Sequence, residues 1–502
     1  MIIPVVFSLA PVCEELIYSW SFYKGIDIVK HYGWPLFAQR QYFEEKETQR
    51  EKGFYSEAVA KHNDMEYYSP ADEAKYIQVM FPEELIQQYI EQFPSQTDAY
   101  VASLGNPWPQ MTEFMVMKVR ELEQKTGEKA EAFLCLCDTA FIRDAANQLN
   151  IDILHYEWAP LRSPTYRNTA YLDLTGNICD GELTARYEAF RQVSQELPLF
   201  NRREILAFFL NNDYLHYAYD ADPEPEYEVG LGFGYNVPWI FNHLSQMTSA
   251  EMYTKAEKIF GDNILVRYHP SDPMHADLRR GVRDSGSLVE FMRKCRRIVC
   301  NTSGLAYEAM LFNRPAYEMG QSQYRYFTNQ NLNELPDHIA DDAFLSFIAF
   351  GYCIPFELLK SVQYLRWRLS RPSEKEIYMY HLNYYMNCLN VSASVVSLTE
   401  PDRLKAILEA RQVDTGAICV EDEPLWMKSD EISRLHATIE RYKRRVEVLE
   451  KENQDIRNQL NVIHAHTEEL EATCNYMMTS KSWRITKPLR VFTRIFQFRR
   501  QE

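Results

Sequence analysis

The sequences ILVRYHPSD (residues 264–272) and RRIVCNTSGLAYEAMLFNRPAYEMG (residues 296–320) decide the fold class of this chain. Each contains a short apolar run with β-branched residues, at 264–266 and at 298–300, and each run ends in polar residues. Such runs are typical of buried parallel strands. The second run leads into apolar residues at helical spacing that begin with Leu305, which predicts a helix. Strands that alternate with helices predict an α/β fold with a parallel sheet.

The junction between the second predicted strand and its helix has residues suited to bind a phosphate. Thr302, Ser303 and Gly304 precede the helix, and hydroxyl side chains at this position cap free backbone amides. The start of a helix also carries the positive end of the helix dipole. His269 and Pro270 follow the neighbouring strand, so the imidazole is expected at the same edge of the sheet. A cap of this kind also occurs in α/β proteins without a ligand there, which leaves a purely structural role open.

Taken together, these residues resemble the nucleotide-sugar half of GT-B glycosyltransferases. The resemblance is to the capsule-polysaccharide and Kdo (3-deoxy-manno-octulosonic acid) transferases, and it rests on His269, Pro270, Thr302, Ser303, Glu308, Ala309 and Pro315. It implies that His269 and the two hydroxyls hold the phosphate of the donor. It also implies that Glu308 lies near the ribose of the nucleotide.

A second group of candidate residues follows the predicted strand at 151–156. Glu157 lies just past that strand, and Arg162 lies in a proline-rich loop. A carboxyl that is partly withdrawn from water has a raised pKa and can exchange protons near neutral pH, while an arginine can hold a carboxylate or phosphate. A surface salt bridge between the two is the alternative. The sequence EWAPLRSPTYRNTAY at 157–171 resembles the retaining β-Kdo transferases of O-antigen and capsule assembly, which implies that Glu157 is the acid/base carboxylate.

The chain departs from that family in one respect. The resemblance predicts an acidic nucleophile just after the first strand of the second half, but residues 231–236 read LGFGYN and contain no carboxylate. Asp220 and Asp222 lie before the predicted strand. Without the nucleophile a covalent glycosyl intermediate cannot form. The enzyme would then invert with Glu157 as base, retain by another route, or be inactive.

Composition limits the class of protein. Hydrophobic residues make up 46% and charged residues 25% of the 502 residues, as in ordinary globular proteins. The net charge of -17 argues against a general nucleic-acid binder. The ten cysteines show no spacing typical of a metal site, so we predict no metal and no cofactor, and a reducing, cytoplasmic context. The short apolar start reads as a first strand rather than a signal peptide, and no apolar run is long enough to span a membrane.

The pattern of strands and helices predicts two facing Rossmann-like domains, followed by a long coiled-coil helix. We predict an N-terminal acceptor-side domain at 1–200 and a C-terminal nucleotide-sugar-binding domain at 201–410. Within the first, we expect a strand at 99–105 and a mostly helical stretch at 36–92. The facing carboxyl ends of two such sheets form a cleft for ligands.

The C-terminal region predicts an extended appendage. Residues 428–475 carry a heptad pattern typical of a coiled coil, and Asn453 at an a position favours a defined register. One long helix that packs back on the globular part is the alternative. In the tail at 476–502, residues 481–500 contain basic and aromatic residues and no acid, which suits an anionic membrane surface. A similar string follows the coiled coil of many bacterial polysaccharide glycosyltransferases, and docking on a partner enzyme is equally compatible with it.

These patterns predict a glycosyltransferase that moves Kdo or a related sugar from CMP to a lipid-linked oligosaccharide in O-antigen or capsule assembly. We expect it on the cytoplasmic face of the inner membrane as a peripheral protein, with self-association or polysaccharide-assembly partners through the coiled coil. Two alternatives stay open at this point: a GT-B transferase that uses a UDP- or GDP-sugar, and an inactive scaffold that acts through its coiled coil and basic tail.

Overall fold

The structure is a computed structural model, and it describes a defined part of the chain. The described residues are 1–10, 15–44, 76–136, 139–176, 181–233, 247–268, 280–301, 303–320, 322–333 and 339–388, with Ala472 and Tyr476. The chain divides into two compact units, Met1–Val420 and Glu421–Glu502. The predicted coiled coil and basic tail lie outside the described residues apart from Ala472 and Tyr476, which are helical.

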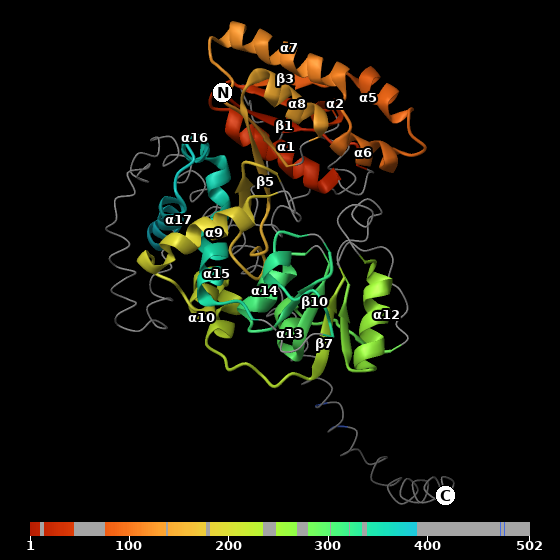
Figure 1. Cartoon of the computed structure of the whole chain (residues 1–502), viewed down its shortest axis with the longest axis vertical. Coiled ribbons are helices and arrows are strands. Elements are labelled where there is room, and N and C mark those ends of the chain that lie inside the picture. The colour runs from red at the N-terminus through yellow and green to blue at the C-terminus, as the bar shows by residue number, and fades with distance from the viewer. Residues whose placement is uncertain are drawn as a thin grey trace, which may run out of the picture. The chain divides into compact units, whose positions relative to one another are not determined.

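Within the described part of the first unit, the strands form two sheets (Figure 1). The first sheet has the order β12-β6-β5-β4-β1-β2-β3. Its strands are β1 (Ile2–Val6), β2 (Pro35–Ala38), β3 (Ile77–Met80), β4 (Ala132–Cys135), β5 (Asp152–Trp158), β6 (Thr169–Asp173) and β12 (Cys353–Pro355). Neighbours from β5 to β3 are parallel, whereas β6 runs antiparallel to both β5 and β12. The predicted parallel sheet is therefore present with an antiparallel strand inserted near one edge.

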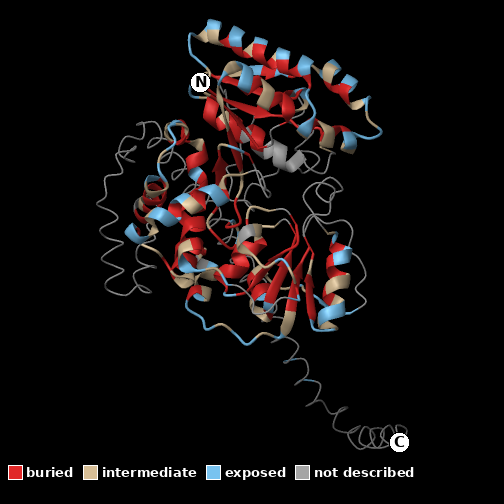
Figure 2. Cartoon of the chain, viewed as in Figure 1, coloured by how far each residue is buried: buried red, intermediate tan, exposed pale blue. Residues whose placement is uncertain are grey.

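Helices cover this sheet on both sides. Figure 1 shows α7 and α8 on one side and α1 on the other. The helices of this region are α1 (Glu15–Val29), α2 (Arg40–Glu44), α5 (Glu83–Ile90), α6 (Gln96–Gly105), α7 (Pro109–Thr126) and α8 (Ala140–Leu149). Five strands, β1, β2, β4, β6 and β12, are buried along their length, whereas β5 is buried only in its middle and the edge strand β3 only at Val79. The outer face of α7 is exposed (Figure 2). A parallel sheet requires such cover, because both of its faces are apolar.

One expectation for this region was wrong. The stretch 99–105 is not a strand but belongs to α6, whose first turn is capped by the Ser95 hydroxyl, which accepts a hydrogen bond from the Asp98 amide at 3.1 Å. A short apolar run fits either a strand or a buried helix, and tertiary packing decides between them. The stretch 36–92, expected to be mostly helical, contributes α2 and α5 as well as the strands β2 and β3, and its residues 45–75 lie outside the described part.

The second sheet is parallel throughout and has the order β11-β10-β7-β8-β9. Its strands are β7 (Tyr227–Gly232), β8 (Ile264–Arg267), β9 (Val282–Arg283), β10 (Cys295–Cys300) and β11 (Ala316–Glu318). It is accompanied by α12 (Ser249–Phe260), α13 (Leu288–Lys294) and α14 (Leu305–Leu311). The two strands predicted from the opening stretch are β8 and β10, and the predicted helix is α14, so this part of the sequence analysis is confirmed.

Successive side chains of β7 point to opposite faces of the second sheet, and the residues on each face explain how helices cover it. Val229 and Leu231 point into the apolar cluster that contains α12. Gly230 and Gly232 face the opposite side, where a Cβ on Gly230 would lie 3.0 Å from Phe291 Cζ of α13 and a Cβ on Gly232 would lie 2.2 Å from Leu305 Cδ2 of α14. The two glycines thus let the helices on that side approach the strand closely, as a residue without a side chain permits.

The chain returns to the first sheet after the second one. This return is made by α15 (Asp342–Ser346), the π-helix η6 (Phe347–Tyr352), β12, η7 (Phe356–Lys360), α16 (Val362–Leu369) and α17 (Glu374–Cys388). Earlier connections are α9 (Leu183–Val193), η3 (Ser194–Glu196), α10 (Arg202–Phe209), η4 (Asn212–Ala218) and, after β11, η5 (Arg325–Phe327). The domain limits at 200 and 410 stay predictions, but β12 shows that a segment assigned to the second range completes the first sheet.

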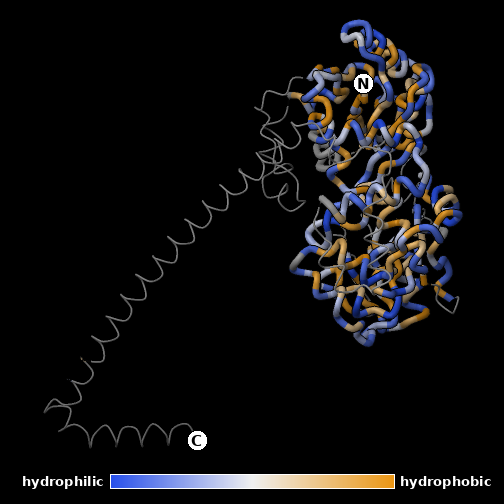
Figure 3. The backbone as a smooth tube through the Cα atoms, turned by 90° about the vertical axis from the view of Figure 1, so that its left-hand side faces the viewer, coloured by the Kyte–Doolittle hydropathy of each residue, from blue (hydrophilic) through white to orange (hydrophobic). Residues whose placement is uncertain are grey.

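Hydrophobic residues gather in the interior of the described part, as the hydropathy of the tube shows (Figure 3). Two clusters are the larger ones. One contains the first sheet with its helices, and the other contains the loop after β5 together with α9, α10, α14, α15 and α17. In the second cluster, residues that follow β5 pack with residues of α14. Among the described residues, no helix is both long and apolar enough to cross a membrane.

Candidate active site

Glu157 occupies the carboxyl end of β5, as the sequence predicts. It pairs with Tyr171 of β6 in the sheet, and its side chain is half-buried. Burial raises the pKa of Glu157 to about 7, while the Trp158 amide, which donates to Glu157 Oε1 at 2.8 Å, and the charge of Arg162 oppose the rise. A carboxyl with this pKa that keeps some access to solvent can both take up and release a proton near neutral pH.

The loop after Glu157 is held by backbone hydrogen bonds rather than by prolines alone. The Ala159 amide donates to the Thr169 carbonyl at 3.1 Å, and the Thr169 amide donates to the Leu161 carbonyl at 2.9 Å. The Ser163 amide donates to Asn168 Oδ1 at 2.8 Å. These bonds hold Glu157 and Arg162 in fixed positions relative to each other. A surface salt bridge on a mobile loop would not require such a fixed arrangement.

The charge of Arg162 acts on two carboxyls. Its side chain is exposed, and within the described part of the chain it makes no hydrogen bond or ion pair. Its charge nevertheless lowers the pKa of Glu157 and the pKa of Glu308, so it lies within electrostatic range of both. The guanidinium donors are therefore available to an anionic ligand.

The start of α14 contacts the loop after β5. A Cβ on Gly304 would lie only 2.8 Å from Pro160 Cβ, so glycine permits this close approach. Ser303 is partly exposed, its hydroxyl accepts from the Leu305 amide at 3.2 Å, and its own amide donates to Glu318 Oε2 at 3.3 Å. The predicted hydroxyl at the helix start is thus present, although it bonds within one turn rather than forming a full side-chain cap.

Glu308 faces the loop that carries Arg162. It is buried, with 6% exposure, in α14. Burial raises its pKa to about 7, and Arg162, the Tyr166 hydroxyl and Arg267 lower it. The structure therefore brings Glu157, Arg162, Ser303, Gly304 and Glu308 to one junction, although they come from segments almost 150 residues apart in the chain.

Three predicted site residues are not part of this description. His269, Pro270 and Thr302 lie outside the described residues. Arg267, two positions before His269, is described and ends β8. It donates to Asp284 Oδ2 at 2.6 Å and to the Gly286 carbonyl at 2.7 Å.

The end of β7 carries a glycine at residue 232, packed against Leu305 of α14. A Cβ on Gly232 would lie 2.2 Å from Leu305 Cδ2. Asp220 and Asp222 precede β7 and are engaged in ion pairs, the first with Arg293 at 3.6 Å and the second with Arg202. Neither aspartate supplies the nucleophile that the family resemblance predicts, because the amino end of a strand lies at the opposite edge of the sheet.

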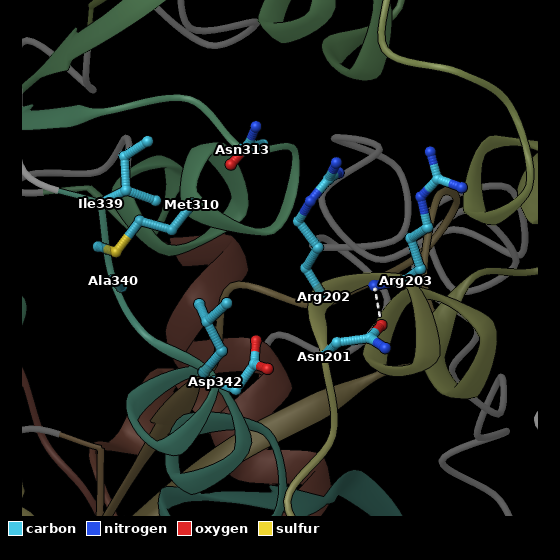
Figure 4. Close-up of a pocket in the computed structure, with 9 residues that line it drawn as sticks. Asn201, Arg202, Arg203, Met310, Asn313, Ile339, Ala340 and Asp342 are labelled. Carbon is cyan, nitrogen blue, oxygen red and sulfur yellow. Dashed lines mark hydrogen bonds between the residues drawn. The ribbon is translucent and has the colours of Figure 1, made fainter. Parts of the chain in front are cut away.

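A cavity of about 280 Å³ lies elsewhere, near the opposite end of α14. It contains none of the predicted site residues, and its lining residues are Asn201, Arg202, Arg203, Met310, Asn313, Ile339, Ala340, Asp342 and Leu345. Figure 4 shows the side chains of Arg202 and Arg203 at the start of α10, with Met310 and Asn313 across from them. The dashed bond joins Asn201 Oδ1 to the Arg203 amide (Figure 4). Asn201 thus serves as the cap of α10, and Arg202 is already paired with Asp222.

Sequence reasoning missed Tyr166, Arg267 and Glu318. Tyr166 and Arg267 stand inside the quoted motifs. Arg267 ends β8, and that position is the signal that could have found it, whereas Tyr166 lies in the loop between β5 and β6. Glu318 ends β11, a strand that the sequence analysis did not predict. Among the described residues, no group of three acidic, histidine or cysteine side chains could hold a metal ion.

Comparison with known proteins bears on the first part of the chain. Residues 9–182 match the model of the Glycosyltransferase 99 family N-terminal domain. No curated protein sequence matches the chain. The matched region contains β5 with Glu157 and Arg162 but not α14.

Solved structures give weaker similarities. A Thermosulfurimonas dismutans KpsC, beta Kdo 2,7 transferase, is 15% identical over 48% of this chain and 82% of its own, with a TM-score of 0.30. A beta Kdo 2,4 transferase KpsC from the same organism is 16% identical over 47% and 87%, with a TM-score of 0.31. Os79 from O. sativa in complex with UDP is 9% identical over 81% and 95%, with a TM-score of 0.28. At such TM-scores no common fold follows; the family match to residues 9–182 is what supports a glycosyltransferase.

Proposed function

We propose that this protein is a glycosyltransferase of the GT-B type that moves Kdo or a related sugar from a CMP donor to a lipid-linked glycan. The observation that carries the proposal is Glu157: a half-buried carboxyl with a pKa of about 7 at the carboxyl end of β5. It lies in the region that matches a glycosyltransferase family model. A group with this pKa can accept the proton of an acceptor hydroxyl at physiological pH.

The other residues of the junction have roles that follow from their chemistry. Arg162, with its unused guanidinium donors, would hold a carboxylate or phosphate. Ser303 and Gly304, with His269, Pro270 and Thr302, would bind the donor phosphate, and Glu308 would lie on the ribose side. Positive groups directed at the departing phosphate stabilise the charge that develops there.

The sequence LGFGYN at residues 231–236, which contains no carboxylate, supports a route without a covalent intermediate. With no carboxylate at the end of β7, Glu157 would act as base for direct attack of the acceptor hydroxyl on the donor sugar. The bond between sugar and phosphate breaks as the new glycosidic bond forms, and the nucleotide leaves with both electrons of the broken bond. This route predicts inversion at the anomeric carbon.

A donor screen on the full chain tests the proposal. CMP-Kdo, a UDP-sugar and a GDP-sugar are each supplied with a synthetic glycolipid acceptor, and nucleotide release is measured. CMP release that disappears in Glu157→Gln supports the proposal. Release of UDP or GDP instead would show that the donor is a UDP- or GDP-sugar. The scaffold alternative would be favoured if no donor releases its nucleotide and the C-terminal region binds an assembly partner.

The C-terminal region would place this active site at its lipid-linked acceptor. Residues 481–500 would bind the anionic inner-membrane surface, and the segment 428–475 would form a coiled coil with a second copy or an assembly partner. Flotation with vesicles that contain an anionic phospholipid checks the first point. Removal of residues 476–502 should abolish flotation while transfer to a soluble acceptor continues, and unchanged flotation would contradict the anchor.

A further inference from the structure

Glu318 is the last residue of β11, and it is buried, with 1% exposure. It pairs in register with Cys300 of β10. Two backbone hydrogen bonds fix this position: the Glu318 amide donates to the Asn329 carbonyl at 3.1 Å, and the Met319 amide donates to the Cys300 carbonyl at 2.9 Å. The place of the Glu318 side chain is therefore set by the sheet.

Both carboxyl oxygens of Glu318 accept hydrogen bonds at this end of the sheet. Oε2 accepts from the Ser303 amide at 3.3 Å and from the Cys300 thiol at 3.6 Å, and Oε1 accepts from the Gly320 amide at 3.2 Å. Burial, and then the charge of Glu318, raise the pKa of the Cys300 thiol, so the thiol keeps the proton that it donates. Bonds from a backbone amide to a carboxylate are among the stronger hydrogen bonds in proteins. Glu318 therefore ties Ser303 to the end of β11.

The hydrogen bonds of Ser303 leave one of its polar groups unused. Its amide donates to Glu318, its carbonyl accepts from the Ala306 amide at 3.3 Å, and its hydroxyl oxygen accepts from the Leu305 amide at 3.2 Å. A hydroxyl can also donate its hydrogen. Within the described part of the chain the Ser303 hydroxyl donates to no group, and Ser303 is partly exposed. The hydroxyl hydrogen, and not the amide, is what Ser303 can offer to a ligand.

The residue after Ser303 packs against the loop that carries Arg162. A Cβ on Gly304 would lie 2.8 Å from Pro160 Cβ, so the turn has no room to move toward that loop. The bond to Glu318 holds the preceding residue to β11. The Ser303 hydroxyl therefore has a fixed place beside the loop with Arg162. A binding group that is fixed before the ligand arrives loses less entropy on binding.

We infer that Glu318 is a positioning residue, which holds the Ser303 amide so that the Ser303 hydroxyl donates to the phosphate of the nucleotide donor. The inference rests on the proposed function, because the proposed function assigns Ser303 to that phosphate. Glu318 acts through Ser303 and does not touch the donor. The hydroxyl of Ser303, rather than its amide, is thus the group that recognises the anion.

The test uses the full chain and compares Glu318→Ala, Glu318→Gln, Ser303→Ala, the combination of Glu318→Ala with Ser303→Ala, and Glu123→Ala. Glu123 is the matched control, since its Oε1 also accepts from a backbone amide, that of Ala130 at 2.9 Å, but it lies in α7. CMP is the probe, its affinity is measured by calorimetry, and melting temperatures check that each variant is folded. Glu318→Ala and Ser303→Ala are each expected to weaken CMP binding roughly 5- to 30-fold, the effect of one hydrogen bond.

Two further results separate positioning from a structural role. The combined variant should bind CMP no more weakly than Ser303→Ala alone, because Glu318 acts only through Ser303. Glu318→Gln keeps one acceptor oxygen and should lose less affinity than Glu318→Ala, while Glu123→Ala should match the wild type. Additive losses in the combined variant, or wild-type affinity in Glu318→Ala, would overturn the inference and leave the proposed function standing, since the wild type still binds CMP in both cases.

Hydrogen exchange without ligand covers two cases: the wild type binds no CMP, which would contradict the proposed donor, or Glu318→Ala does not fold. Exchange is followed by mass spectrometry resolved to single amides. In the wild type the Ser303 amide should exchange more slowly than the Glu84 amide in the first turn of α5, which no side chain caps. Faster exchange of the Ser303 amide in Glu318→Gln supports the hold on Ser303 independently of the donor. Equal exchange of the two amides in the wild type would overturn the inference.

Discussion

The end of β5 and the first turns of α14 each present a glutamate with a pKa near 7, but the two regions use it differently. Glu157 is half-buried and bonded to its neighbour's amide, whereas Glu308 is buried in α14 beside Tyr166, Arg162 and Arg267. Burial alone raises both pKa values. The two pKa values are similar, so the difference in exposure separates the roles. The half-buried Glu157 suits proton exchange with a substrate, whereas the buried Glu308 suits a fixed, oriented role.

The largest expected effect is a loss of glycosyl transfer when Glu157, rather than Glu308, is replaced. Glu157→Gln should lower transfer by roughly 10²- to 10⁴-fold, the usual contribution of a general base, with no loss of thermal stability. CMP release and product formation measure it. Glu84→Gln, an exposed substitution at the start of α5, is the control and should be fully active. A Glu157→Gln variant with wild-type transfer would remove Glu157 from the chemistry.

The second effect concerns stability and pH at Glu308. Its pKa rises from 4.5 to about 7 on folding, so the folded protein keeps a proton that the unfolded chain has lost. The free energy of unfolding therefore falls as pH rises from about 4.5 to about 7, by up to about 3 kcal/mol for this group. Glu308→Gln should remove that loss and be more stable than the wild type at pH 8 but not at pH 4.

Denaturant unfolding at these two pH values checks the sign. An equal difference between Glu308→Gln and wild type at both values would show that Glu308 ionises as an ordinary surface carboxyl. Glu84→Gln again serves as control, because its exposed position gives no reason for a difference that depends on pH.

A third variant tests whether the two regions are in contact at Gly304. Gly304→Ala places a Cβ 2.8 Å from Pro160 Cβ, so either the loop or α14 must shift. We expect a loss of about 1 to 3 kcal/mol in the free energy of unfolding, as for other overpacked sites. Gly105→Ala, which meets nothing within 4 Å at the end of α6, is the matched control and should be neutral or slightly stabilising. Equal stability of the two variants would argue against the contact.

The smallest effect is a shift of the pH profile. Arg162 lowers the pKa of both glutamates, so Arg162→Ala should move the rising limb of transfer, expected near pH 7, upward by about half a unit to one unit. Initial rates from pH 5.5 to 9 measure it. Arg191→Ala, an exposed change on α9, should leave the midpoint in place. A downward shift would mean that Arg162 does not act on these carboxyls.

The local order of elements was predictable because it depends on short-range patterns. The runs at 264–266 and 298–300 form β8 and β10, and the helix predicted from Leu305 is α14. The run at 99–105 failed because a short apolar segment fits a helix as well as a strand once its neighbours supply the packing. The antiparallel β6 and the return of β12 were not predictable, since they depend on pairing between distant segments.

For the site, the sequence by itself determined which residue types stand at a strand end and at a helix start: Glu157 at the end of β5, and Ser303 and Gly304 before α14. Their neighbours in the chain suffice for that, because strand ends and helix starts are local. Only the tertiary structure decided that Pro160 packs on Gly304 and that Tyr166 and Arg162 face Glu308. These contacts join the loop that follows β5 of the first sheet to α14 beside the second sheet. Burial by the whole fold, not composition, is what raises both carboxyl pKa values to about 7.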